Sequence, residues 1–236
     1  MILAIDGSSL VASVALANHD KVIAEYSTNQ KKTHSQTLLP MIDEIMKATD
    51  TDKKEIEAVA VSKGPGSFTG LRIASATAKG ISLALNIPVV AVPTLESLAY
   101  NFCTSTQIIC PIMDARRNQV YTGIYRFDGM EPIIIKEQTP MDIRDLLNEL
   151  RKIGETVIFL GDGVPVYKGI IEDEFEIPHI FAPNHMSRQR AASVAVLAYR
   201  YIEEGKVQTS DEHVPEYLRV SQAERERMER DSKNDE

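Results

Sequence analysis

The order of apolar segments repeats along the chain, and this repeat limits the fold more than any single motif. In the first half, three short apolar runs joined by tight turns read as strands, and the second turn lies at Asn18–Asp20. Later segments of this half read as helices at 35–48 and 71–86 and as strands at 55–64 and 87–93. The second half restarts with strands at 107–113, 119–126, 131–136 and 156–160 and a helix at 141–152. Each half therefore predicts a mixed sheet covered by helices.

We therefore predict an α/β protein of two lobes with related architecture. The N-terminal lobe covers 1–104 and the C-terminal lobe covers 105–220, and a late helix at 188–204 is free to pack back on the N-terminal lobe. Residues 221–236 contain almost no apolar side chains, and we expect a flexible, charged tail there. The first helix contains Pro40, which we expect to be tolerated only in a first turn.

The amino-acid composition of the chain limits the classes of function that are possible. The chain has 236 residues, 43% of them hydrophobic, which is enough for a full core. Its formal net charge of −8 argues against electrostatic binding of nucleic acid, because such binding depends on clustered Lys and Arg. The spacing of Cys103 and Cys110 fits neither a metal site nor a redox motif. We expect both to be core thiols in a protein of a reducing compartment. With no leader-like start and no apolar run of about 18 residues, we expect a cytoplasmic protein without a membrane segment.

The stretch KGPGSFTGLR, residues 63–72, resembles a phosphate-binding loop. A helix N-terminus does favour anions. However, five residues separate Gly64 from Gly70, and Leu71-Arg72 stand where the P-loop pattern requires Lys and a hydroxyl residue. The glycine spacing does not fit the dinucleotide-binding pattern either. The sequence favours a turn at Pro65-Gly66, with Ser67 or Thr69 capping the following helix.

Small residues dominate the helix at 71–86, so neighbouring elements can approach it closely. A helical projection gives one broad core face, composed of Leu71, Ile73, Ala74, Thr77, Ala78, Ile81, Ala84 and Leu85. The opposite face gathers Arg72, Ser75, Ala76, Lys79 and Leu83. This second face is either plain solvent-exposed surface or a flat docking patch, with Leu83 as an apolar anchor and Arg72 as a rim charge.

Several stretches together resemble the TsaB family, also called YeaZ: IDGSS, THSQTLLP, KGPGSFTGLR, PTLESLA and MDARRNQVY. The resemblance covers residues 2 to about 219. It implies a two-lobe fold of the actin, Hsp70 and sugar-kinase type, which is ribonuclease H-like. It also implies a non-catalytic subunit that is needed for threonylcarbamoyl transfer to adenosine 37 of ANN-decoding tRNAs. The implied partners are the catalytic protein TsaD and the ATPase TsaE, which use the metal and the ATP, so that this chain needs no cofactor.

The catalytic relatives carry an HxxxH metal-binding pair, and the corresponding stretch here is residues 94–98. Thr94 and Leu98 occupy the two histidine positions, and the remaining Glu96 cannot hold a transition metal alone. The five histidines elsewhere show no ligand spacing, and no nucleophile elbow is present. We therefore expect no metal and no catalytic residue.

Two turns resemble the nucleotide-binding turns of such folds. They are Asp6-Gly7-Ser8 and Gly161-Asp162-Gly163, and without a phosphate-handling Lys or paired acids they predict at most a vestigial nucleotide contact. The charged cluster at 114–117 reads either as a salt-bridged turn or as a contact to a partner or tRNA, and the turn is favoured.

The predicted partner surface combines both N-terminal helices. It comprises His34, Leu38, Met41, Ile45, Arg72, Ser75, Ala76, Lys79 and Leu83. Because a partner of like fold presents similar helices, the same surface would form a homodimer when TsaD is absent. We expect tRNA contact only within the complex. The alternatives are a glycoprotease-like metallopeptidase, a kinase-like enzyme acting alone, and a stand-alone nucleotide-binding protein.

Overall fold

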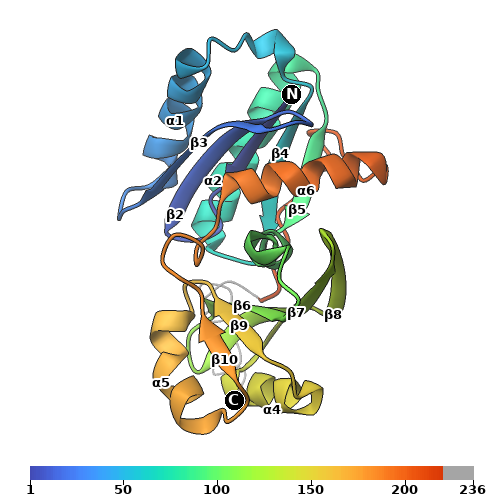
Figure 1. The fold of residues 1–236 in the computed structure, drawn as a ribbon. Helices are drawn as coiled ribbons and strands as arrows, with labels where there is room; N and C mark the ends of the chain where they lie inside the picture. The colour runs from blue at the N-terminus through green and yellow to red at the C-terminus, as the bar shows by residue number, and fades with distance from the viewer. Residues whose placement is uncertain (220–236) are drawn as a thin grey trace, which may run out of the picture.

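The structure, a computed structural model, describes residues 1–219, and it contains two five-stranded sheets, one above the other in Figure 1. The strand order is β3-β2-β1-β4-β5 in the first sheet and β10-β9-β6-β7-β8 in the second. The expected arrangement of two mixed, helix-covered sheets is confirmed, whereas the predicted tail at 221–236 lies outside the described residues.

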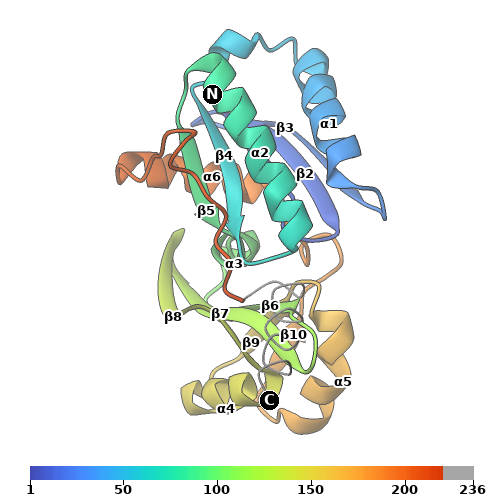
Figure 2. The same ribbon diagram turned by 180° about the vertical axis from the view of Figure 1, so that it is seen from behind.

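The first sheet consists of β1 (Ile2–Asp6), β2 (Val11–Ala17), β3 (Val22–Asn29), β4 (Ala58–Gly64) and β5 (Val89–Pro93). Its central strands are buried on both faces, which explains their mainly apolar sequence. Leu3 and Ile5 pack against α1 (His34–Ala48) and α2 (Phe68–Leu85), whereas Ile2 and Ala4 face α6 (Ala191–Glu203). Figures 1 and 2 show these helices on opposite faces of the sheet.

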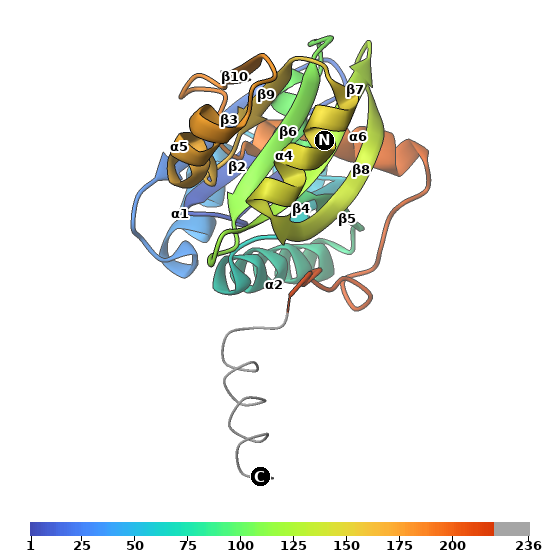
Figure 3. The ribbon, with the colours of Figure 1, turned by 90° about the horizontal axis from the view of Figure 1, so that it is seen from below.

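The second sheet consists of β6 (Ile108–Asp114), β7 (Gln119–Asp128), β8 (Glu131–Asp142), β9 (Val157–Leu160) and β10 (His179–Phe181). On the side away from the first lobe, α4 (Ile143–Ile153) and α5 (Val164–Glu174) cover it (Figure 3). The short helix α3 (Thr94–Ala99) packs its Leu95 and Leu98 on the other face. One-turn 3-10 helices lie at Lys53–Glu55 and Tyr100–Phe102.

Pro40 corrects one expectation about α1. The helix begins at His34, so the proline lies beyond the first turn. Proline removes one intrahelical hydrogen bond, which leaves the carbonyl of Gln36 without its helical donor. Both Gln36 and Pro40 are exposed. Water can therefore hydrate that carbonyl, and the helix continues past the proline.

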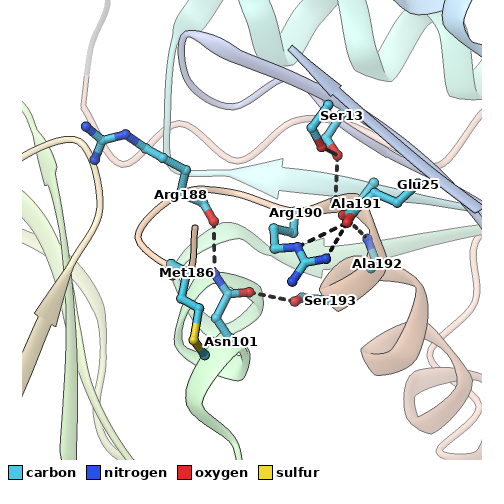
Figure 4. Close-up of polar contacts among 10 residues, drawn as sticks. Ser13, Glu25, Asn101, Met186, Arg188, Arg190, Ala191, Ala192 and Ser193 are labelled. Carbon is cyan, nitrogen blue, oxygen red and sulfur yellow. Dashed lines mark hydrogen bonds and ion pairs between the residues drawn. The ribbon is translucent and has the colours of Figure 1, made fainter. Parts of the chain in front are cut away.

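Asn101 ties together the two segments that connect the lobes. Its Nδ2 donates to the carbonyls of Met186 (3.0 Å) and Arg188 (2.9 Å), and its Oδ1 accepts from Ser193 Oγ (2.7 Å) (Figure 4). Hydrogen bonds also attach the start of α6 to the first sheet. Glu25 accepts from the guanidinium of Arg190 and from the amide of Ala192 at 3.0 Å.

The segment 206–219, which we call the C-terminal strap, follows α6 and runs beside α2 toward the second lobe (Figure 2). Gln208 exchanges two backbone hydrogen bonds with Val89 at 2.8 and 2.9 Å. Further along, Lys79 Nζ donates to the carbonyl of His213 (3.1 Å), and Arg72 Nε donates to Tyr217 Oη (3.2 Å). The strap therefore covers one flank of α2.

Candidate functional site in the cleft between the lobes

A cavity of about 970 Å³ lies between the two lobes. The first lobe contributes Ser8, Ser9, His34 and the segment 65–69 to its lining. The second lobe contributes residues 113–116, Tyr121 and Asp162, and the strap contributes residues 216–219. The cavity thus collects polar groups from three parts of the chain that are distant in sequence.

The glycines of KGPGSFTGLR allow α2 to begin directly against the turn between β1 and β2. A Cβ at Gly66 would lie 2.2 Å from the carbonyl oxygen of Ser8, and one at Gly70 would lie 2.1 Å from that of Gly7. The Ser67 amide donates to the Ser8 carbonyl at 2.6 Å, and Ser67 Oγ caps the helix by accepting from the Gly70 amide. The predicted Ser67 cap is confirmed, and residues 65–66 form a bend. Close backbone packing is the reason for these glycines.

Asp6 is buried and does not line the cavity. It is fully buried, and its Oδ1 accepts from the amide of Ser8 (2.9 Å) and from Ser8 Oγ (2.7 Å). Burial raises the pKa of Asp6, although the hydrogen bonds from Ser8 oppose the shift. Gly7 lies beneath the ring of His34 and beside Ala74. Of the Asp6-Gly7-Ser8 turn, Ser8 lines the cavity.

The second glycine turn packs against β6. The Gly163 amide donates to the Ile112 carbonyl at 3.0 Å, and a Cβ at Gly161 would meet that same oxygen at 2.1 Å. Asp162, between them, lines the cavity. The structure thus brings Ser8 and Asp162 into one cavity, whereas Gly161 and Gly163 support the wall behind it.

Burial raises the pKa of Asp162 to about 6, against a favourable interaction with Arg188. Because the folded state holds this proton more tightly than the unfolded chain, Asp162 lowers the free energy of unfolding as pH rises from about 4 to about 6. Asp162→Asn should therefore raise the free energy of unfolding by about 1–2 kcal/mol at pH 7 and change it little at pH 4. Urea unfolding at both pH values measures this, and an equal effect at both would contradict it.

The charged cluster after β6 forms a tight turn. Asp114 Oδ1 accepts from the Arg116 amide (2.8 Å) and from Tyr167 Oη (3.0 Å). Arg116, Arg117 and Asn118 have φ values of 64°, 55° and 60°, so three successive residues adopt the left-handed conformation. This geometry turns Asp114 and Arg116 toward the cavity, which both of them line.

The stretch at 94–98 is buried structure. Thr94 Oγ1 accepts from the Gly64 amide (3.2 Å), and Glu96 accepts from Tyr201 Oη (2.8 Å). Burial raises the pKa of Glu96. Within residues 1–219, no group of three or more His, Cys, Asp or Glu side chains is arranged to hold a metal ion.

Four residues of the predicted partner surface are buried within the chain itself, so their assignment to an exposed surface is wrong. They are His34, Leu38, Ile45 and Ser75. Leu38 and Ile45 face the first sheet as part of its core, because they lie on the same side of α1 as Ile42. A helical projection cannot show which side of a helix the rest of the chain covers.

The remaining residues of the predicted partner surface either contact the strap or are at least partly exposed to solvent. Lys79 is half-buried and bound to the strap, and the guanidinium of Arg72 lies 4.0 Å from the ring centroid of Phe68. Met41 is half-buried, Ala76 is exposed, and Leu83 is 72% exposed. On α1, Leu39 is also exposed. The sequence analysis missed the strap because its contacts join residues far apart in the chain.

Two sheet-centred lobes around a polar cleft define the class of the actin, Hsp70 and sugar-kinase fold. The solved structure of YeaZ from Pseudomonas aeruginosa matches with a TM-score of 0.76 at 24% identity, covering 92% of this chain and 99% of that one. An inorganic polyphosphate/ATP-glucomannokinase from Arthrobacter matches with a TM-score of 0.50 at 9% identity, over 84% and 98% of the two chains. The expected fold class is confirmed. No helix within residues 1–219 is long and apolar enough to cross a membrane.

Comparison with sequence relatives assigns the chain to one family within this fold class. The family described as "TsaD: tRNA N6-adenosine threonylcarbamoyltransferase" matches residues 21–227. The Bacillus subtilis tRNA threonylcarbamoyladenosine biosynthesis protein TsaB is 36% identical over 94% of this chain and 96% of its own length. The Escherichia coli protein of the same name is 37% identical over 54% of this chain and 55% of its own length. The chain belongs to the TsaB family, as its motifs predict.

Proposed function

We propose that this chain is a non-catalytic scaffold subunit required for threonylcarbamoyl transfer to adenosine 37 of ANN-decoding tRNAs in the cytoplasm. Its relatives carry the name of threonylcarbamoyladenosine biosynthesis proteins, which supports this pathway. The observation that carries the non-catalytic role lies at α3, where Thr94 and Leu98 replace the histidines of the metal-binding relatives. Both are fully buried, and Glu96 between them is bound to Tyr201.

The scaffold would bind TsaD through the exposed faces of α1 and α2 and would also bind TsaE. These two helices lie on the same face of the first sheet (Figure 2). Leu39, Ala76 and Leu83 supply exposed apolar or small side chains there, with Arg72 at the rim. A homodimer would use the same surface when TsaD is absent and would compete with it. In this proposal the partners supply the ATP and metal chemistry, and tRNA meets the chain only within the complex.

Reconstitution tests this function. With TsaD, TsaE, ATP and a threonylcarbamoyl donor held constant, addition of this chain should switch on tRNA modification. The measurement is threonylcarbamoyladenosine per tRNA by mass spectrometry, with heat-denatured chain as the control. Equal modification without the chain would contradict the proposal. Stoichiometric tight metal, or ATP turnover by the chain alone, would support an independent enzyme instead.

A further inference from the structure

A smaller hollow of about 310 Å³ lies between the C-terminal end of α2 and the strap. The end of α2 and the turn after it contribute Ser82, Leu83 and residues 86–88 to its lining, and the strap contributes residues 207–210 and Glu212. This volume is at the lower limit for small-ligand sites, so the hollow suits a single side chain better than a cofactor. It shares no lining residue with the cavity between the lobes.

Apolar side chains form much of the wall of this hollow. Leu83 on α2 and Val207 on the strap both line it, and they are 72% and 43% exposed. Residues 87–88 add further apolar surface. The two backbone hydrogen bonds between Gln208 and Val89 hold the strap side of the hollow on the first sheet. Neighbouring exposed apolar side chains around a hollow are typical of an interaction site.

Glu212 places a fixed negative charge at the hollow. Its Oε2 accepts from the amide and from Oγ1 of Thr209, both at 2.9 Å, and its own amide donates to Thr209 Oγ1 at 3.3 Å. The hydrogen bonds from Thr209 lower the pKa of Glu212, so the carboxylate is ionised at neutral pH. No Lys or Arg among residues 1–219 forms an ion pair with this carboxylate. The negative charge therefore has no partner in the described part of the chain.

The C-terminal end of α2 adds negative potential to the same hollow. The last carbonyls of a helix lack intrahelical donors, and the helix dipole makes this end negative. Lys or Arg in the last turn often offsets this potential, but α2 has no basic residue there. Lys79, the last basic residue of the helix, donates instead to the carbonyl of His213. A group that fits the hollow therefore has an apolar body and a positively charged end.

We propose that this hollow binds an arginine side chain of a protein that docks on α2. The apolar stem of arginine packs against Leu83 and Val207, and its guanidinium donates to the carboxylate of Glu212. The protein is the partner that meets the exposed face of α2, because Leu83 belongs both to that face and to the lining of the hollow. The site itself is independent of the proposed function, whereas the identification of TsaD as the source of the arginine rests on it.

NMR titration of the full chain with N-acetyl-arginine amide tests the site. The probe should shift the amide signals of residues 83–87 and 207–212 saturably at constant ionic strength. N-acetyl-citrulline amide has the same shape without the charge and should bind about three- to fivefold more weakly, as expected for an exposed ion pair. Glu212→Gln should remove this difference. Asp211→Asn should preserve it, because Asp211 is an exposed neighbour that does not line the hollow. Absence of saturation, or equal affinities of the two probes for the unaltered chain, would overturn the site.

Calorimetric titration with TsaD tests the source of the arginine. Glu212→Lys should weaken association about tenfold or more, because two cations would then meet inside an interface that excludes water. Asp211→Lys is the matched control and should bind TsaD normally.

The outcomes of this titration separate the site from the scaffold role. If TsaD binds the unaltered chain and both variants equally, the assignment of the arginine to TsaD is overturned while the scaffold role stands. If Glu212→Lys abolishes only the homodimer, the arginine comes from a second copy, and the assignment to TsaD is again overturned. Absence of any TsaD binding would count against the scaffold role, and the arginine titration would still decide the site.

Discussion

Arginine at position 76 is expected to abolish association with TsaD while the chain stays folded. Ala76 is exposed on α2, between Arg72 and Leu83 on the proposed docking surface. An arginine there places a bulky charge where two helices would otherwise come into close contact, and such a clash can exclude a partner outright. Arginine is also a good helix former, so α2 itself should be little affected. We expect affinity to fall by about 100-fold or more.

Size-exclusion chromatography of the mixed proteins and calorimetric titration measure this loss. Val166→Arg is the matched control, because Val166 is an exposed apolar residue on α5 of the second lobe. That variant should bind TsaD normally. The Ala76→Arg chain should also be monomeric by light scattering, since the homodimer is proposed to use the same surface. A full complex with Ala76→Arg would place the partner elsewhere.

Gly70→Ala is expected to produce a large loss of stability from the addition of a single methyl group. Its Cβ would lie 2.1 Å from the carbonyl oxygen of Gly7, a backbone atom that has no flexible side chain to move aside. Either α2 or the turn between β1 and β2 must then shift. Overpacking of this kind costs about 3 kcal/mol of unfolding free energy.

Gly80→Ala in the same helix is the control for Gly70→Ala. Apart from its chain neighbours and the backbone of the helix itself, no heavy atom of residues 1–219 lies within 4 Å of a Cβ built at Gly80. The substitution there should raise the free energy of unfolding by about 0.5–1 kcal/mol, because alanine is the better helix former. Urea unfolding monitored by circular dichroism compares the two variants. Equal effects of the two substitutions would show that the contact at Gly70 does not limit the packing of α2.

The sheets could be predicted from sequence because their strands are short apolar runs separated by turn residues. β1 and β2 are buried along their whole length, and this burial is visible as mainly apolar sequence, with Asp6 and Ser13 as the polar residues. The helix α5 carries a weaker pattern and was missed. Its sequence includes Pro165 and Gly169, two residues that usually mark loops, and only Tyr167 and Ile171 are buried.

The site was less accessible to sequence reasoning because its decisive contacts are distant along the chain. Local pattern identified the turn at residues 64–67 but could not show that Gly66 and Gly70 are needed for contact with the backbone at Gly7 and Ser8. Similarly, the strap carries little apolar sequence and is held mainly by polar contacts such as Lys79 to His213. A helical projection of α2 alone could not show which flank of this helix the strap covers.

The strap also changes how the two lobes can move. Besides the two connecting segments, it forms a third link, because Glu216 bonds to Lys63 in one lobe and to Gln138 in the other. Arg219 extends the link by donating to the carbonyl of Ala115 (2.8 Å). Opening the cleft by hinge rotation would have to break these bonds. The molecule is therefore braced against such opening, and a partner would meet α1 and α2 in a fixed orientation relative to the second lobe.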